Sequence, residues 1–299
     1  MKKDFTNFID TLQINIKKQI GFLDPSSKFK IDKWKRDEGG GGLTMAIENG
    51  DVFEKGGVNI SKVFGVLPDS ISKTINVEPS EFYACGISLI LHPKNPMVPT
   101  FHANLRYFEL YENGKVADKW FGGGVDLTPY YVFEDDISMF HQKLKKICDD
   151  FNPDCYKKFK KNCDEYFWNK HRKEARGVGG LFFDYCRETT ENNIESWFEF
   201  MVNLGNKLMD PYTNIVKKRK NMSFSKNNLE WQQIRRGRYV EFNLIHDKGT
   251  VFGLKTNGRI ESILISMPPQ AKWAYSWVPK KNSEEEKLLK ILKKPINWL

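Results

Sequence analysis

The sequence predicts a single α+β domain that spans residues 1–299. Short alternating runs of apolar and polar residues between Phe29 and Pro129 are typical of antiparallel strands. Helical spacing of apolar residues dominates the segment from Glu134 to Lys220. No linker rich in proline, glycine or serine separates these segments, which favours one domain over two.

The chain is expected to begin with a helix, because Phe5, Ile9 and Leu12 recur at helical spacing up to Gly21. In the strand segment that follows, the Asn-Gly pairs at 49–50 and 113–114 predict tight hairpin turns. Further helices are then expected at four places, namely 135–150, 154–176, 191–209 and 211–220.

Strand patterns return in the last part of the chain. Leu181-Phe182-Phe183, placed between two of the helices, is expected to form a short strand. After one more helix, strands are expected at 239–245, 250–255 and 259–266, with the last two joined by a turn at Asn257-Gly258. Sheet residues are therefore expected on both sides of the helical segment.

Composition and charge exclude some classes of protein, but they do not identify an activity. The formal charge of +9 favours acidic partners without choosing among nucleic acid, anionic lipid and carboxylate-rich metabolites. The longest apolar run, from Tyr83 to Leu91, is far short of the roughly 20 residues that span a bilayer, so no integral membrane segment is expected. Five cysteines without close pairing indicate a reducing compartment, and no targeting signal is visible. A cytoplasmic protein is therefore expected.

A polar face is predicted on two neighbouring strands. Residues two apart in a strand share a face, so His102, Asn104 and Arg106 lie together, opposite the apolar residues that alternate with them. The same parity joins Ser88 and His92 in the preceding strand. Imidazole, amide and guanidinium groups are costly to bury unpaired, so either a polar ligand or solvent should meet this face.

The segment from Trp120 to Tyr131 adds a carboxylate beside a glycine turn. Three consecutive glycines in an aromatic, strand-like context suggest that a ligand approaches the backbone closely or that the backbone has unusual torsions. Asp126 follows at once, and its carboxylate would accept hydrogen bonds from the N–H groups of a ligand stacked among aromatic rings. The alternative is that Asp126 is a turn or cap residue before Thr128-Pro129.

Arginines near the end of the chain suit a polycarboxylate ligand. Arg235, Arg236 and Arg238 precede Tyr239, and Arg259 follows Asn257-Gly258. Arginine binds carboxylates through two parallel hydrogen bonds, although pairing with Glu241, Asp247 or Glu261 would explain the same residues. No nucleic-acid-binding motif accompanies them, so no nucleic-acid partner is expected.

Long strings of this sequence resemble oxygen-dependent coproporphyrinogen III oxidase. They begin at His102 (HANLRYF), Trp120 (WFGGGVDLTP), Lys170 (KHRKEARGVGGLFFD), Arg236 (RGRYVEFN) and Glu261 (ESILISMPP). The resemblance runs in collinear order from about Trp34 to Trp277. It implies a homodimer whose subunits each hold a large flat antiparallel sheet covered by helices on both faces.

The same resemblance implies an activity in haem synthesis. Two propionates of coproporphyrinogen III become vinyl groups and give protoporphyrinogen IX, with O2 as co-substrate and CO2 and H2O2 released. No organic cofactor takes part, and the roles of protein residues are orientation, electrostatics and proton transfer.

The resemblance also implies roles for individual residues of this sequence, each matched by its position in the family's motifs. His102 resembles the family's proton donor, and Asp126 resembles an aspartate that holds the pyrrole N–H groups. Substrate contacts are implied at Ser88, Asn104, Leu105, Arg106, Asn257, Gly258 and Arg259. Asn257 departs from the glycine that bacterial relatives have at this turn. The segment 239–273 resembles the family's dimerisation segment.

A divalent metal is also implied, because some bacterial members are described with a histidine set that corresponds to His92, His102, His141 and His171. Other members are described as metal-free, so His102 has two competing roles. The oxygen-independent route to the same product uses a CxxxCxxC cluster motif, which Cys148, Cys155 and Cys163 do not form. A non-catalytic tetrapyrrole or nucleic-acid binder is the alternative from another class.

Overall fold

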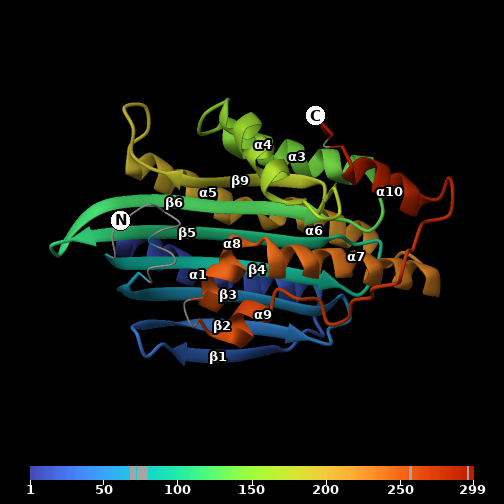
Figure 1. The fold of residues 1–299 in the computed structure, drawn as a ribbon, viewed down its shortest axis with the longest axis horizontal. Helices are drawn as coiled ribbons and strands as arrows, with labels where there is room; N and C mark the ends of the chain where they lie inside the picture. Colours follow the sequence, from blue (N-terminus) through green and yellow to red (C-terminus); the bar gives the residue numbers. More distant parts are fainter. Residues whose placement is uncertain (68–71, 73–79, 256–257, 295) are drawn as a thin grey trace.

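The chain is built around one seven-stranded antiparallel sheet in the order β1-β2-β3-β4-β5-β6-β9 (Figure 1). The computed structural model describes residues 1–67, 72, 80–255, 258–294 and 296–299. The strands are β1 (Phe29–Lys35), β2 (Gly40–Glu48), β3 (Phe53–Val66), β4 (Glu81–Pro93), β5 (Thr100–Glu112), β6 (Lys115–Thr128) and β9 (Gly179–Cys186). Neighbours in sequence pair with one another from β1 to β6, as the predicted hairpin turns require.

One face of the sheet carries the main hydrophobic core. It is covered by α1 (Lys2–Leu23), α3 (Glu134–Asp149), α5 (Ile194–Lys207) and α6 (Met209–Arg219). Phe5, Ile9 and Leu12 of α1 recur at helical spacing and are buried in the same core as Phe101 and Leu105 of β5. The predicted parity of β5 is confirmed, because its odd-numbered residues face this core.

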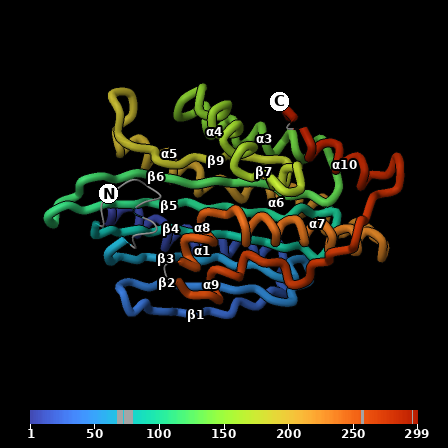
Figure 2. Tube along the Cα trace, viewed as in Figure 1, coloured from blue at the N-terminus to red at the C-terminus, as the bar shows by residue number. Residues whose placement is uncertain are grey.

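The opposite face is covered by α7 (Lys226–Ile245), α8 (Lys248–Lys255) and α9 (Ile260–Leu264). Tyr239 and Ile265 pack there against Ile90 of β4. Figure 2 shows this late part of the chain lying over the first strands, so segments far apart in sequence are neighbours in space. The expected α+β fold with helices on both faces of a large antiparallel sheet is confirmed.

The remaining elements lie at the β9 edge and beyond. α4 (Cys155–Tyr166) packs on β9, and a two-stranded hairpin of β7 (Trp168–Asn169) and β8 (Glu174–Ala175) follows it. α10 (Glu284–Leu292) lies near the end of the chain. The helix expected at 154–176 was therefore wrong beyond Tyr166. The chain continues there into the β7–β8 hairpin, whose turn includes Lys173 with a positive φ of 54°.

The strands expected at 239–245, 250–255 and 259–266 were also wrong. The first is the end of α7, the second lies in α8 and the third contains α9. In α7, Trp231, Ile234, Tyr239 and Phe242 are buried along one face at helical spacing, and this packing overrides the local alternation. Ser225 caps the helix in a capping box with Asn228. The expected turn residue Asn257 lies outside the described residues.

The five cysteines are free and buried, in agreement with the expectation that they form no disulfide framework. Within the part of the chain that the structure describes, no helix is long and apolar enough to cross a membrane.

Candidate active site

A pocket of about 330 Å³ lies between the polar face of the sheet and the helices α7–α9. Its lining includes six residues singled out from the sequence, which are Ser88, His102, Asn104, Arg106, Gly258 and Arg259. The polar face therefore lines a pocket under a helical cover, and it is not simply a solvated side of the sheet.

Strand register explains why these side chains converge. His102 lies opposite Asp126, and Asn104 lies opposite Ser88 on its other side. Directly opposed residues of an antiparallel pair point to the same face, so the pocket collects side chains from β4 and β5, and Asp126 of β6 lies beside His102.

Glycine in β6 makes room for an ion pair in this pocket. Arg106 Nη2 lies 2.8 Å from Asp184 Oδ2 of β9, across the strand that carries Gly122. A Cβ atom at Gly122 would lie 2.6 Å from Asp184 Oδ1 and 2.8 Å from Arg106 Nε. Only a residue without a side chain allows Arg106 to reach Asp184, so this glycine of the sequence motif has a defined steric role.

Asp126 and His102 form a hydrogen-bonded pair at the wall of the pocket. His102 Nδ1 donates to Asp126 Oδ1 at 2.8 Å, so the other ring nitrogen, Nε2, is left for the pocket. The Asp126 side chain is 3% exposed, whereas the His102 side chain is 20% exposed. His102 is therefore placed to meet a ligand, and Asp126 is placed to orient His102.

Arg176 is the third member of this group, and sequence reasoning gave it no role. Its Nη2 atom donates to both oxygens of Asp126 at 2.8 Å each, and its Nη1 atom donates to Asn243 Oδ1 at 2.7 Å. Burial alone would raise the pKa of the Asp126 carboxyl, but Arg176 and His102 outweigh burial, and the pKa lies below its ordinary value. Asp126 is thus an anion between a guanidinium and an imidazole, which argues against a simple turn or cap.

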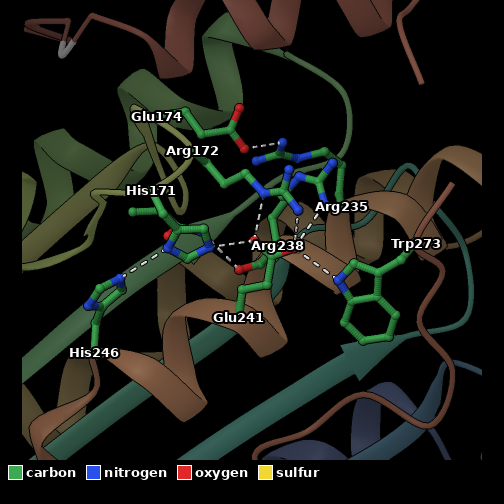
Figure 3. A network of polar contacts seen from close by, with 9 residues as sticks. His171, Arg172, Glu174, Arg235, Arg238, Glu241, His246 and Trp273 are labelled. Atoms are coloured by element: carbon green, nitrogen blue, oxygen red, sulfur yellow. Dashed lines mark hydrogen bonds and ion pairs between the residues drawn. The ribbon is translucent and has the colours of Figure 1, made fainter. Parts of the chain in front are cut away.

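The β7–β8 hairpin places Arg176, and polar contacts dock this hairpin on α7 (Figure 3). Glu241 of α7 accepts from Arg172 Nε and Nη2 at 2.7 Å each, from His171 Nε2 at 2.8 Å and from Trp273 Nε1 at 2.9 Å. Burial raises the pKa of Glu241, but these donors outweigh it and lower the pKa to about 2. The buried pair of Arg235 and Glu174, 2.6 Å apart, fixes the second strand.

Most of the late arginines are therefore structural. Arg235 pairs with Glu174, Arg238 pairs with Glu241 at 3.0 Å, and Arg236 pairs with Glu54. Of the arginines considered near the end of the chain, Arg259 lines the pocket, and its guanidinium pairs with Asp32 of β1.

Comparison with known proteins decides the family. A family model described as coproporphyrinogen III oxidase matches residues 4–298. The chain belongs to the coproporphyrinogen III oxidase family. It is 49% identical over 281 residues to an oxygen-dependent coproporphyrinogen-III oxidase of Drosophila melanogaster, covering 91% of this chain and 71% of that protein.

Relatives from plants and bacteria match nearly the whole chain. Coproporphyrinogen-III oxidase 1 of Arabidopsis thaliana, a chloroplastic protein, is 45% identical over 306 residues, which are 99% of this chain and 78% of that protein. An oxygen-dependent coproporphyrinogen-III oxidase of Francisella philomiragia is 46% identical over 304 residues, which are 99% of this chain and 97% of that protein.

One of the substrate contacts implied by the coproporphyrinogen III oxidase resemblance, the Leu105 side chain, does not face the pocket. The Leu105 side chain is fully buried in the core on the α1 face, because odd-numbered residues of β5 point away from the pocket. A contact with Leu105 is therefore limited to its backbone. Asn257 lies outside the described residues, but Gly258 lines the pocket, and a Cβ atom there would lie 2.8 Å from the Gly253 carbonyl oxygen.

The histidine set expected from bacterial members of the family is not brought together. The imidazole of His92 is buried and forms a hydrogen bond with the Ser266 carbonyl at 2.9 Å. Both ring nitrogens of His141 form hydrogen bonds, one with the Tyr156 hydroxyl and one with the Val178 carbonyl. His171 lies in the Glu241 network outside the pocket lining. Among the described residues, no group of three or more histidine, cysteine, aspartate or glutamate side chains could hold a metal ion. The four histidines point to different partners because they lie on different elements.

Proposed function

We propose that this protein catalyses the aerobic oxidative decarboxylation of two propionates of coproporphyrinogen III, giving protoporphyrinogen IX. In each step a propionate side chain becomes a vinyl group, one O2 is consumed, and one CO2 and one H2O2 are released. The observation that carries this proposal is the pair of Asp126 and His102 beside a pocket lined by several arginines, Arg106 and Arg259 among them. Family membership and the names of the relatives support the same reaction.

Different pocket residues bind different groups of the substrate. Arg106 and Arg259 attract the propionates, because guanidinium groups form strong charge-assisted hydrogen bonds with carboxylates. Both arginines already have an aspartate partner, so a substrate carboxylate joins or replaces that partner. Ser88 and Asn104 add neutral hydrogen-bonding groups to the same pocket.

His102 is the group that moves a proton. Its Nδ1–H is held by Asp126, so Nε2 is the atom that gives or takes a proton at the reacting propionate or pyrrole. The porphyrinogen is electron-rich and reacts with O2 after a pyrrole loses its proton. In this proposal the protein needs no organic cofactor and supplies orientation, an anionic partner for His102 and cationic partners for the carboxylates.

An oxygen-uptake assay tests the proposed reaction. Purified protein is mixed with coproporphyrinogen III in air without added cofactor, and O2 uptake and protoporphyrinogen formation are followed together. We expect one O2 for each CO2 released and two for each product molecule. Tight binding without turnover in air would contradict the proposal and would favour a tetrapyrrole carrier.

We also propose that the protein is a homodimer that associates through residues 239–273. Large apolar side chains are exposed in this segment, including Ile245 at 57% and Ile260 at 49% exposure. Sedimentation velocity should give the mass of a dimer, and Ile245→Glu should shift it toward the monomer. A wild-type monomer at micromolar concentration would contradict this proposal.

The cytoplasm is the location that we propose. Five free, buried cysteines suit a reducing compartment. Some relatives are named as chloroplastic, so recovery of the protein in an organelle fraction would overturn this assignment.

A further inference from the structure

A row of small residues crosses the sheet between Trp34 of β1 and Arg106 of β5. Trp34 pairs with Gly42, Gly42 with Ser61, Ser61 with Gly86, and Gly86 with Arg106. Four steps between adjacent strands, of about 4.8 Å each, separate the ends of this row by about 19 Å. Since directly paired residues share a face, the row forms a low floor under the pocket.

Trp34 forms the wall of the pocket at the β1 end of this row. Its indole lies over Gly42, where a Cβ atom would be 2.4 Å from Trp34 Cζ2. Its Nε1 atom donates to Thr44 Oγ1 at 3.3 Å, and Thr44 Oγ1 lies 2.7 Å from Ser262 Oγ of α9. The ring is thus held in place between β1 and the helical cover, and it lines the pocket.

Cationic side chains flank this wall. Alternation along β1 puts Asp32 and Trp34 on the pocket face, and Arg36, the residue after β1, continues this alternation, while Lys33 and Lys35 between them are exposed. Arg36 lines the pocket, and its Nε atom lies 3.3 Å from a carboxylate oxygen of Glu38, which is 48% exposed. Asp32 pairs with Arg259. The end of the pocket remote from His102 therefore has two guanidinium groups on either side of an aromatic ring.

We propose that Trp34 and Arg36 are substrate-binding residues that hold the end of the macrocycle remote from His102. Trp34 packs against a pyrrole ring, and Arg36 binds a propionate that is not reacting. This inference rests on the proposed function. A macrocycle with four carboxylates presents some of them away from the reacting group, and a floor of Ser61 and Gly86 leaves a broad ligand free to reach the Trp34 ring, which lies over Gly42.

Binding of coproporphyrin III, the oxidised form that does not turn over, tests the inference directly. Arg36→Ala should raise its Kd by about tenfold or more, through loss of a charge-assisted hydrogen bond. Trp34→Ala should raise the Kd by roughly three- to tenfold. The matched control is Lys35→Ala, which removes one charge from the adjacent, exposed residue and should bind like the wild type.

Steady-state kinetics provide a second readout. Because both residues bind a part of the substrate that does not react, KM should rise in the variants while kcat stays within about twofold of the wild type. Melting temperatures check that the variants fold. If Trp34→Ala fails to fold, Ser61→Leu replaces it, since a branched side chain on the floor should also weaken binding.

The outcomes separate the two proposals. Failure of the wild type to bind coproporphyrin III or to consume O2 with the porphyrinogen would reject the proposed function. Normal binding and turnover by the wild type, with Arg36→Ala and the floor or wall variant both matching Lys35→Ala, would reject only the role of Trp34 and Arg36.

Discussion

His102 Nδ1 lies 2.8 Å from Asp126 Oδ1, on the strand directly opposite. This hydrogen bond fixes the tautomer of the imidazole, because a carboxylate only accepts. Arg176 occupies both oxygens of the same carboxylate. The arrangement supports a role for Asp126 in orienting His102, in place of the direct contact with pyrrole N–H groups that the family resemblance implied.

Asp126→Asn distinguishes these two roles. The amide of asparagine can donate to His102 Nδ1 and so favours the wrong tautomer, and kcat should fall by about 10²- to 10⁴-fold. The Kd for coproporphyrin III should stay near the wild-type value. A large loss of binding would instead support direct contact between Asp126 and the macrocycle, and a normal kcat would remove Asp126 from the mechanism.

Leu105→Ala should damage stability and leave substrate affinity unchanged. Leu105 is fully buried in the core on the α1 face, and such a truncation costs about 2–5 kcal/mol. Urea unfolding measures the loss, and KM measured below the unfolding transition should match the wild type. A raised KM with unchanged stability would show that the side chain contacts substrate.

Gly122→Ala should raise KM by disturbing Arg106. The added methyl group would lie 2.6 Å from Asp184 Oδ1 and 2.8 Å from Arg106 Nε, so the ion pair has to move apart. Gly21→Ala makes the same chemical change in α1, where nothing lies within 4 Å of the added atom, and serves as the control. Equal KM values for the two variants would show that the Arg106–Asp184 geometry is not needed for binding.

His141→Gln should change the pH dependence of stability. Burial lowers the pKa of His141 from 6.5 to about 3, so the folded chain holds this ring neutral while the unfolded chain protonates it. The contribution of His141 to stability is therefore complete above about pH 6.5 and is lost as pH falls toward 3, with a slope of up to about 1.4 kcal/mol per pH unit.

Urea unfolding at several pH values between 7 and 4 measures this slope. The His141→Gln variant should show a shallower decline, smaller by about one proton taken up on unfolding. Identical slopes for the wild type and the variant would contradict the prediction.

Local periodicity was enough to predict much of the site. The two-residue repeat of β5 placed His102, Asn104 and Arg106 on one face, and the structure confirms that they line one pocket. The glycines at 122–124 suggested a ligand close to the backbone or unusual torsions. The structure instead explains Gly122 by the Arg106–Asp184 pair, and the approach of a ligand stays a prediction. The strand prediction succeeded because side-chain parity depends on residues near one another in sequence.

The helices that cover the pocket were predicted poorly from the sequence. The alternation at 239–245 suggested a strand, but burial of Tyr239 and Phe242 along one face of α7 stabilises a helix. The role of Arg176 was missed as well, although it lies in one of the strings that carry the family resemblance, because nothing in its neighbourhood along the chain reveals Asp126 as its partner.

By itself, the sequence determined the fold class, the polar face of β4 and β5, and membership of the coproporphyrinogen III oxidase family. Only the tertiary structure decided that Leu105 points away from the pocket, that the four expected histidines do not form one site, and that Trp34 and Arg36 face the ligand space. The physical reason is that side-chain parity is set within a strand, whereas burial, ion pairing and pocket walls depend on contacts between residues far apart in the chain.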